Sequence, residues 1–179
     1  RSGTSNPSAA RYTRGEQQKL MSVMDKLLQA IATLGPIGKL PAPGTAGSVV
    51  AVITGLYLMS FGPLILGFGC LIVLVLGTIA SEHYTRITGR KDPSEVIIDE
   101  VAGQWSVLLC IPYGTTDMLI WVGAGFLLFR FFDIVKPPPV STAETLPGGI
   151  GIMADDMVAG TLAGICLLIL SYLTGTPLF

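Results

Sequence analysis

The sequence predicts an all-α, polytopic membrane helical bundle. Half of the 179 residues are apolar and only 13% are charged, whereas about 25% charged residues is usual for a soluble domain. The charges are also unevenly spread, because residues 40–81 and 157–179 contain none. Apolar stretches of roughly 18 or more residues are typical of transmembrane helices, since hydrocarbon offers backbone amides no partner outside their own helix. We therefore expect about five transmembrane spans.

The N-terminal region precedes these spans and divides into two parts. Residues 1–22 are rich in Ser, Arg and Lys and predict a disordered tail. Residues 23–35 form an apolar stretch that is too short to cross a bilayer. This stretch predicts a short helix that lies at the membrane interface or packs on the bundle. Residues 23–179 are then expected to form one membrane-embedded domain.

Five apolar segments account for the expected spans. They cover residues 44–60, 64–81, 96–111, 118–135 and 152–173, and they are separated by Gly/Pro turns or polar loops. Lys and Arg occur in the N-terminal region, in the loop after the second segment and directly after the fourth. The two intervening turns contain neither residue. By the positive-inside rule, this asymmetry predicts that the N-terminus and the Lys- and Arg-containing loops face the cytoplasm.

The cytoplasmic ends of four segments carry ionisable or hydroxyl side chains. These residues are Thr45 and Ser48 in the first segment, Asp99 and Glu100 at the start of the third, Arg130, Asp133 and Lys136 at the end of the fourth, and Asp155 and Asp156 in the first turn of the fifth. A charge within a span costs about 2.5–3.5 kcal/mol on insertion scales, so it usually faces a partner or a wet cavity. Helix capping or anchoring at the membrane interface explains the position of a single charged residue. Neither role requires two adjacent acids on each of two helices, as in Asp99–Glu100 and Asp155–Asp156.

Acidic residues outnumber basic ones in this group. The five carboxylates face only Arg130 and Lys136, which leaves a formal charge of −3. At the edge of a low-dielectric region, such an excess raises some pKa values or recruits a divalent cation. Oxygen ligands with no His or Cys nearby favour Mg²⁺ or a similar ion, and a guanidinium suits phosphate oxygens. The group therefore predicts a site for Mg²⁺ and phosphate.

Several kinds of function and chemistry do not fit this sequence. A net charge of −1 gives no indication of nucleic-acid binding. The single histidine, His83, excludes mechanisms that need a pair of histidines. None of the three cysteines is followed by Arg after five residues, as a Cys-based phosphatase requires, and the Asp-x-Asp motif is absent. Metal-assisted attack by water or by an Asp carboxylate remains.

Four strings, taken in order, carry a resemblance to a known family. They are Pro43–Ser48, Asp92–Trp105, Phe129–Pro137 and Gly148–Gly160. In this order they resemble the phosphatidylglycerophosphatase A family over residues 35–173. Two departures are visible, because Ala46 stands where the family usually has a bulkier residue and Pro138 where it often has an aromatic one. Neither departure removes a charged group.

The resemblance implies a bacterial, multi-pass inner-membrane enzyme that depends on Mg²⁺ and has its site at the cytoplasmic face. Residues 23–179 would be its catalytic domain. The implied reaction converts phosphatidylglycerophosphate to phosphatidylglycerol and phosphate, the last step of phosphatidylglycerol synthesis. We expect Mg²⁺ ligands, phosphate donors and an auxiliary acid. They are Asp99, Glu100, Asp133, Asp155 and Asp156 for the metal, Thr45, Ser48, Arg130 and Lys136 for the phosphate, and Asp92 as a base or outer ligand.

Three other kinds of membrane protein fit the same residues less well. A phosphatidyl transferase would carry an Asp-Gly-x-x-Ala-Arg pattern, which is absent. A transporter would place polar residues through the bilayer, whereas only Asp117 lies near the far edge. A structural membrane subunit would leave the acidic group unexplained. No oligomeric state is predicted.

Overall fold

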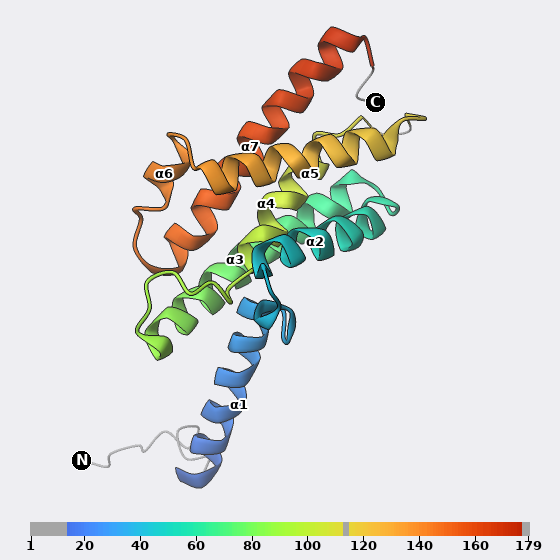
Figure 1. Ribbon diagram of the computed structural model, residues 1–179. Helices are drawn as coiled ribbons and strands as arrows, with labels where there is room; N and C mark the ends of the chain where they lie inside the picture. The colour runs from blue at the N-terminus through green and yellow to red at the C-terminus, as the bar shows by residue number, and fades with distance from the viewer. Residues whose placement is uncertain (1–13, 113–114, 177–179) are drawn as a thin grey trace, which may run out of the picture.

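The computed structural model describes residues 14–112 and 115–176, and this part of the chain is entirely helical (Figure 1). It contains seven α-helices and one short 3-10 helix. They are α1 (Arg14–Thr33), η1 (Ile37–Lys39), α2 (Pro43–Met59), α3 (Pro63–Thr88), α4 (Ile98–Leu108), α5 (Met118–Val135), α6 (Val140–Ala143) and α7 (Gly148–Thr174). The predicted all-α bundle is confirmed.

The first helix packs on α3 and extends away from the other helices (Figure 1). Leu28 and Ile31 of α1 pack against the buried core, whereas Met21, Met24 and Leu27 are exposed. Helix α1 includes residues 14–22 of the segment that we expected to form a tail, and residues 1–13 lie outside the described part of the chain. The apolar stretch at 23–35 belongs to a helix that packs on the bundle, one of the two predicted arrangements.

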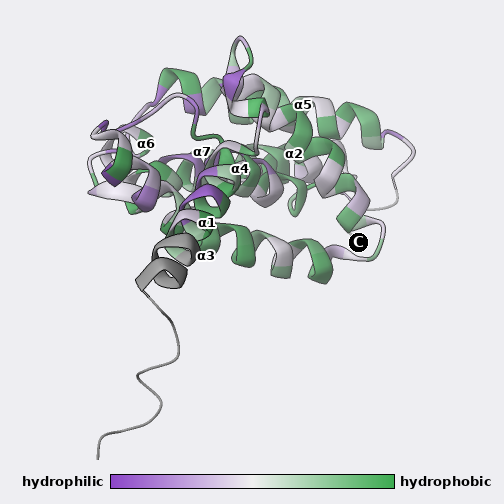
Figure 2. Ribbon diagram, turned by 90° about the horizontal axis from the view of Figure 1, so that it is seen from below, coloured by the Kyte–Doolittle hydropathy of each residue, from purple (hydrophilic) through white to green (hydrophobic). Residues whose placement is uncertain are grey.

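Three helices are long and apolar enough to cross a membrane, namely α3, α5 and α7. Their exposed surfaces are apolar, with side chains such as Leu64, Leu119 and Leu173 between 74% and 82% exposed. Figure 2 shows hydrophobic residues along these helices, whereas hydrophilic residues gather toward α6. A soluble monomer rarely exposes such continuous apolar surface, so these faces suit contact with lipid.

The expected set of five spans is not confirmed, because the helix in the third segment, α4, is too short to cross a membrane. Helix α2 is apolar but has 17 residues. Helix α4 has only 11 residues, so it is about 16 Å long, roughly half the thickness of the hydrocarbon region. Most of its residues are buried by α2, α3, α5 and α7. Residues 96–111 therefore contain a short core helix and not a full span.

Helices α3 and α7 are both longer than predicted. Helix α3 continues to Thr88 through part of the expected polar loop, and its Glu82 and Arg86 form an i,i+4 ion pair, which stabilises a helix. Glu82 also accepts a hydrogen bond of 2.8 Å from the free N–H of Gly149 in the first turn of α7. Because Glu82 supplies this cap, α7 begins at Gly148, and Asp155 and Asp156 lie in its third turn, not its first.

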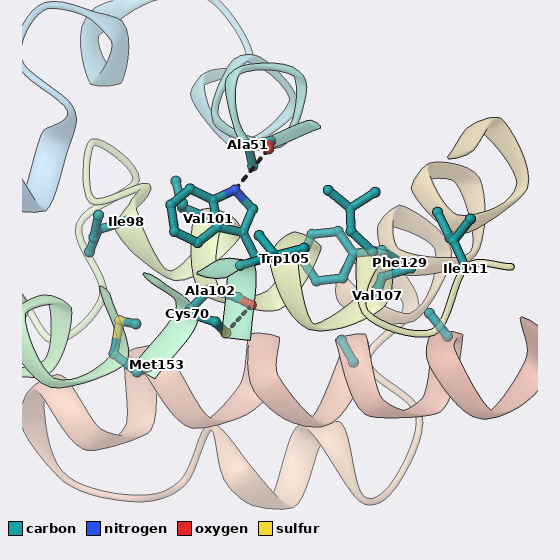
Figure 3. Packing of buried hydrophobic residues seen from close by; sticks show 14 of the residues in the cluster. Ala51, Cys70, Ile98, Val101, Ala102, Trp105, Val107, Ile111, Phe129 and Met153 are labelled. Carbon is teal, nitrogen blue, oxygen red and sulfur yellow. Dashed lines mark hydrogen bonds between the residues drawn. The ribbon is translucent and has the colours of Figure 1, made fainter. Parts of the chain in front are cut away.

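The core is built around α4 (Figure 3). Trp105 of α4 is 7% exposed, and its indole N–H donates a 2.8 Å hydrogen bond to the Ala51 carbonyl of α2. Phe129 of α5 is fully buried and lies against Gly103 of α4. These contacts hold the N-terminal end of α4, with its two acids, between α2, α5 and α7.

Two glycines allow α4 and α7 to approach closely. A Cβ atom on Gly160 would lie 2.5 Å from the Gly103 carbonyl oxygen, and one on Gly103 would lie 2.8 Å from the Asp156 carbonyl oxygen. These neighbours are backbone atoms, so they cannot rotate away. The close packing of these helices therefore requires glycine at both positions.

We predict that Gly160→Ala destabilises the protein by about 1–3 kcal/mol, because an added methyl group forces apart two packed helices. Thermal unfolding of the purified protein in detergent measures the effect. Gly123→Ala in α5 is the matched control, since nothing lies within 4 Å of its Cβ position. Equal unfolding temperatures for the two variants would contradict this description of the α4–α7 contact.

Candidate active site

One pocket of about 320 Å³ collects nearly all of the predicted site residues. Its walls come from the first turn of α2, the loop before α4, the start of α4, the end of α5 and the middle of α7. The predicted residues that line it are Thr45, Asp92, Asp99, Glu100, Arg130, Asp133, Lys136, Asp155 and Asp156. The structure thus brings side chains from distant segments to one place.

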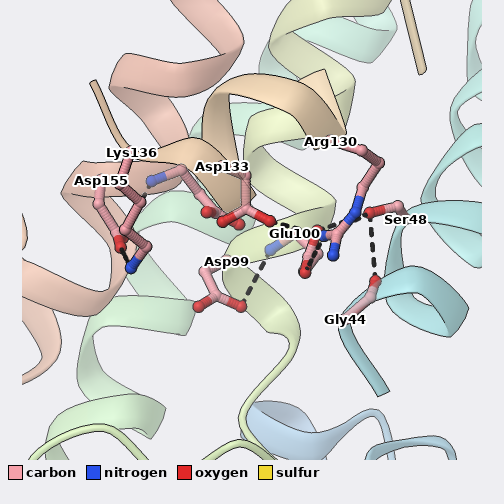
Figure 4. Close-up of polar contacts among 9 residues, drawn as sticks. Gly44, Ser48, Asp99, Glu100, Arg130, Asp133, Lys136 and Asp155 are labelled. Carbon is pink, nitrogen blue, oxygen red and sulfur yellow. Dashed lines mark hydrogen bonds and ion pairs between the residues drawn. The ribbon is translucent and has the colours of Figure 1, made fainter. Parts of the chain in front are cut away.

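Arg130 is the centre of the first group of polar contacts (Figure 4). Its Nη1 atom donates to both carboxylate oxygens of Glu100, at 2.5 Å from Oε2, and lies 2.8 Å from Oδ2 of Asp133. Asp133 is three residues after Arg130 on α5, so both side chains lie on the same face of the helix. One guanidinium therefore compensates two carboxylates, of which Glu100 is only 6% exposed.

Ser48 differs from its predicted role. It is fully buried, and its hydroxyl donates a 2.5 Å hydrogen bond to Oε2 of Glu100. It therefore holds Glu100 in place and does not face the pocket as a phosphate donor. Gly44, one turn earlier in α2, lets the ion pair approach the helix, because a Cβ atom there would collide with Oε1 of Glu100.

Lys136 is the centre of the second group, on the other side of the pocket in Figure 4. Its Nζ atom lies 2.8 Å from Oδ2 of Asp155 and 2.9 Å from Oε1 of Glu144. Burial lowers the pKa of Lys136, but the hydrogen bonds to Asp155 and Glu144 outweigh it and raise the pKa above its ordinary value. Lys136 is therefore charged at neutral pH.

Glu144 is the contact residue that the sequence did not reveal. It follows the short helix α6, in a loop where an acidic residue has no distinguishing pattern. Its pairing with Lys136 depends on the packing of α6 against α7. Only the tertiary structure brings the two charges together.

Asp99 and Asp156 have no basic partner among the described residues. Oδ1 of Asp99 accepts a 3.0 Å hydrogen bond from the Glu100 N–H. Asp156 is 3% exposed, and its Oδ2 atom has no hydrogen-bond partner in the described part of the chain. Isolated carboxylates are costly to bury. These two acids are therefore the ones that a bound cation would compensate most directly.

The set of oxygen donors suits a hard divalent cation, although the side chains do not form a complete cage. Within residues 14–112 and 115–176, no group of three His, Cys, Asp or Glu residues is arranged to hold an ion by itself. Mg²⁺ usually keeps several water ligands and binds through one or two carboxylates together with a substrate phosphate. A Mg²⁺ ion in this pocket would therefore need water or phosphate oxygens as ligands besides the carboxylates.

Thr45 and Asp92 lie at the edge of the pocket, and both are exposed. Thr45 belongs to the first turn of α2, and Asp92 precedes α4 in the loop that joins it to α3. Their positions suit contact with an incoming polar group more than stabilisation of the fold. The predicted residues that line the pocket are thus the acids of α4, α5 and α7, the two cations, and an exposed rim that consists of Thr45 and Asp92.

All residues of the pocket lie within the part of the chain that matches a known family. The family model described as Phosphatidylglycerophosphatase A matches residues 30–171. Phosphatidylglycerophosphatase A of Haemophilus influenzae is 36% identical over 157 residues, which cover 81% of this chain and 94% of that protein. The Escherichia coli protein of the same name is 37% identical over 123 residues, which cover 68% of this chain and 69% of that one.

Another relative carries a different name. A Bacteroides thetaiotaomicron protein, whose name proposes a phosphatidylinositol-3-phosphatase, is 39% identical over 140 residues, which cover 75% of this chain and 86% of that protein. No solved structure matches the chain.

We predict that Arg130→Met destabilises the protein by about 3–5 kcal/mol, because it leaves two carboxylates in the pocket uncompensated. The matched control is Arg86→Met, which removes the exposed Arg86–Glu82 pair and should cost at most about 1 kcal/mol. Thermal unfolding in detergent compares the two. A loss of similar size for both variants would show that the Arg130–Glu100 pair does not stabilise the fold.

Proposed function

Because the chain belongs to the phosphatidylglycerophosphatase A family, we propose that it hydrolyses phosphatidylglycerophosphate to phosphatidylglycerol and phosphate. Its class of activity follows from the family, since the chain is a phosphatase that acts on a phosphate monoester. It is also a bacterial membrane protein. In the bacterial inner membrane, with the site at the cytoplasmic face, the proposed reaction is the last step of phosphatidylglycerol synthesis.

One observation carries the proposal: acids and cations from α4, α7, the end of α5 and the loop before α4 line a single pocket, together with Thr45 of α2. Six carboxylates and two cations leave a formal excess of four negative charges there. A doubly charged phosphate monoester would be repelled by this excess unless a cation enters as well. The charge balance therefore supports a site for phosphate together with Mg²⁺.

The proposed roles follow from the contacts. Arg130 and Lys136 bind the phosphate oxygens and stabilise the negative charge that develops in the transition state. Each already holds carboxylates close to the pocket, so the cations are pre-oriented. Thr45 donates a further hydrogen bond at the rim, and Ser48 keeps Glu100 in position.

The acidic residues hold the metal in this proposal. Asp99, Glu100, Asp155 and Asp156 supply its oxygen ligands, and Asp133 lies beside them. When bound, Mg²⁺ neutralises charge on the phosphate and lowers the pKa of a water molecule. The attacking group is water or an Asp carboxylate, and Asp92 is placed at the rim to accept a proton.

A phosphatidylinositol phosphate is the second candidate substrate, because one relative carries that name. Both lipids present a phosphate monoester on a polyol that is joined to the membrane through a phosphodiester. The transporter, transferase and structural-subunit interpretations receive no support from the comparisons. The two lipid phosphates are therefore the substrates to compare.

We predict that the purified protein releases phosphate from phosphatidylglycerophosphate in mixed micelles faster than from phosphatidylinositol 3-phosphate. Asp99→Asn and Asp156→Asn should each lower this rate by roughly 100-fold or more, because each removes a proposed metal ligand. Asp117→Asn is the matched control, since Asp117 is exposed at the start of α5, away from the pocket. Rates near wild type in both pocket variants would rule out this assignment of the site.

Removal of divalent cations should abolish phosphate release, and addition of Mg²⁺ should restore it. Mg²⁺ together with phosphate should also raise the unfolding temperature of the wild-type protein, because a ligand that binds only the folded state stabilises it. Asp156→Asn should reduce this rise. Full activity after treatment with a chelator would exclude the metal from the proposed function.

A further inference from the structure

A second cavity, of about 180 Å³, lies beside the pocket. It is enclosed by α6, the turn after it, the first turns of α7 and the loop before α4. Figure 1 shows α6 next to the beginning of α7. Its polar lining comprises Lys91, Asp92, Ser141, Glu144, Thr145 and Asp155.

The second cavity adjoins the pocket through shared residues. Asp92 and Asp155 line both. Lys136 lines the pocket and contacts Glu144, which lines the cavity, at 2.9 Å. A molecule whose phosphate lies in the pocket therefore has space for its next atoms in the cavity, on the far side of the Lys136–Asp155 ion pair.

The chemistry of the lining favours an uncharged polyol. Lys91 and three carboxylates line this cavity, and Lys136 pairs with two of these carboxylates, so a formal charge of −1 remains and disfavours a second phosphate group. Carboxylate oxygens accept hydrogen bonds from hydroxyl groups. The Thr145 hydroxyl donates to the Thr142 carbonyl at 2.7 Å, so its oxygen can still accept a hydrogen bond from a ligand.

We propose that the second cavity binds the polyol that carries the scissile phosphate and thereby selects the lipid head group. In phosphatidylglycerophosphate this polyol is a glycerol unit with one free hydroxyl group. Ser141, Thr145 and Glu144 contact that hydroxyl, while the phosphate occupies the pocket. This inference rests on the proposed function and adds the group that the enzyme recognises besides the phosphate.

The test uses two substrates that differ by one hydroxyl group. The first is phosphatidylglycerophosphate, and the second is its deoxy analogue, in which propanediol replaces the glycerol unit. Both carry the same charges, so only contacts with the hydroxyl distinguish them. We expect the wild-type kcat/KM to be roughly tenfold higher for the natural lipid, because a site that bonds a hydroxyl discriminates against its absence.

Thr145→Val removes a proposed partner of the hydroxyl and should lower this kcat/KM ratio toward one. Thr145→Ser should restore it. Thr142→Val is the matched control, because Thr142 lies on α6 but is exposed and does not line the cavity, so its ratio should equal that of the wild type. Ser141→Leu, which fills the cavity, should lower kcat/KM for the natural lipid more than for the deoxy analogue.

Each contrary outcome has a distinct meaning. Equal hydrolysis of the two substrates by the wild type would overturn the polyol site and leave the phosphatase activity intact. Hydrolysis of neither would overturn the proposed function. An unchanged ratio in both Thr145→Val and Ser141→Leu would also reject the polyol site. If Lys91→Met raised KM for both substrates equally while Thr145→Val left the ratio unchanged, the cavity would bind the phosphodiester instead.

Discussion

The buried contact between Arg130 and Glu100 is the interaction on which the site depends. It joins α5 to α4, and the hydrogen bond from Ser48 to Glu100 adds α2 to the same group. A buried ion pair does not by itself show that the fold is stable, because the cost of removing both ions from water can exceed their attraction for each other. The pair does fix the relative positions of α4 and α5, because any movement that separates the two side chains leaves a buried charge without its partner. The pocket therefore has its shape before substrate arrives, and within the described residues Asp99 and Asp156 have no basic partner.

The short helix α4 makes this arrangement possible in a membrane protein. Its apolar residues pack on neighbouring helices, and its first turn carries Asp99 and Glu100 into the pocket. A helix that crossed the whole bilayer would also need lipid-facing surface. Glycines at Gly103 and Gly160 let α4 and α7 approach closely and bring Asp156 into the same pocket as Asp99.

Sequence alone indicated which residues converge, because charges in apolar segments must share a polar environment. It could not distinguish α4 from a span, because a mostly apolar helix fits either a protein core or a membrane. It also missed the Lys136–Glu144 pair and the burial of Ser48, which arise from packing between helices. The start of α7 was misplaced because its cap comes from Glu82 on another helix.

We propose that a cation and a phosphate share the pocket formed by the acids of α4 and α7. Crystals grown with Mn²⁺ in place of Mg²⁺, together with inorganic phosphate, test it most directly through anomalous scattering. We expect a Mn²⁺ peak in direct contact with the carboxylates of Asp99 and Asp156, with phosphate between the ion and Arg130. A peak at another place, with these two carboxylates unliganded, would contradict it.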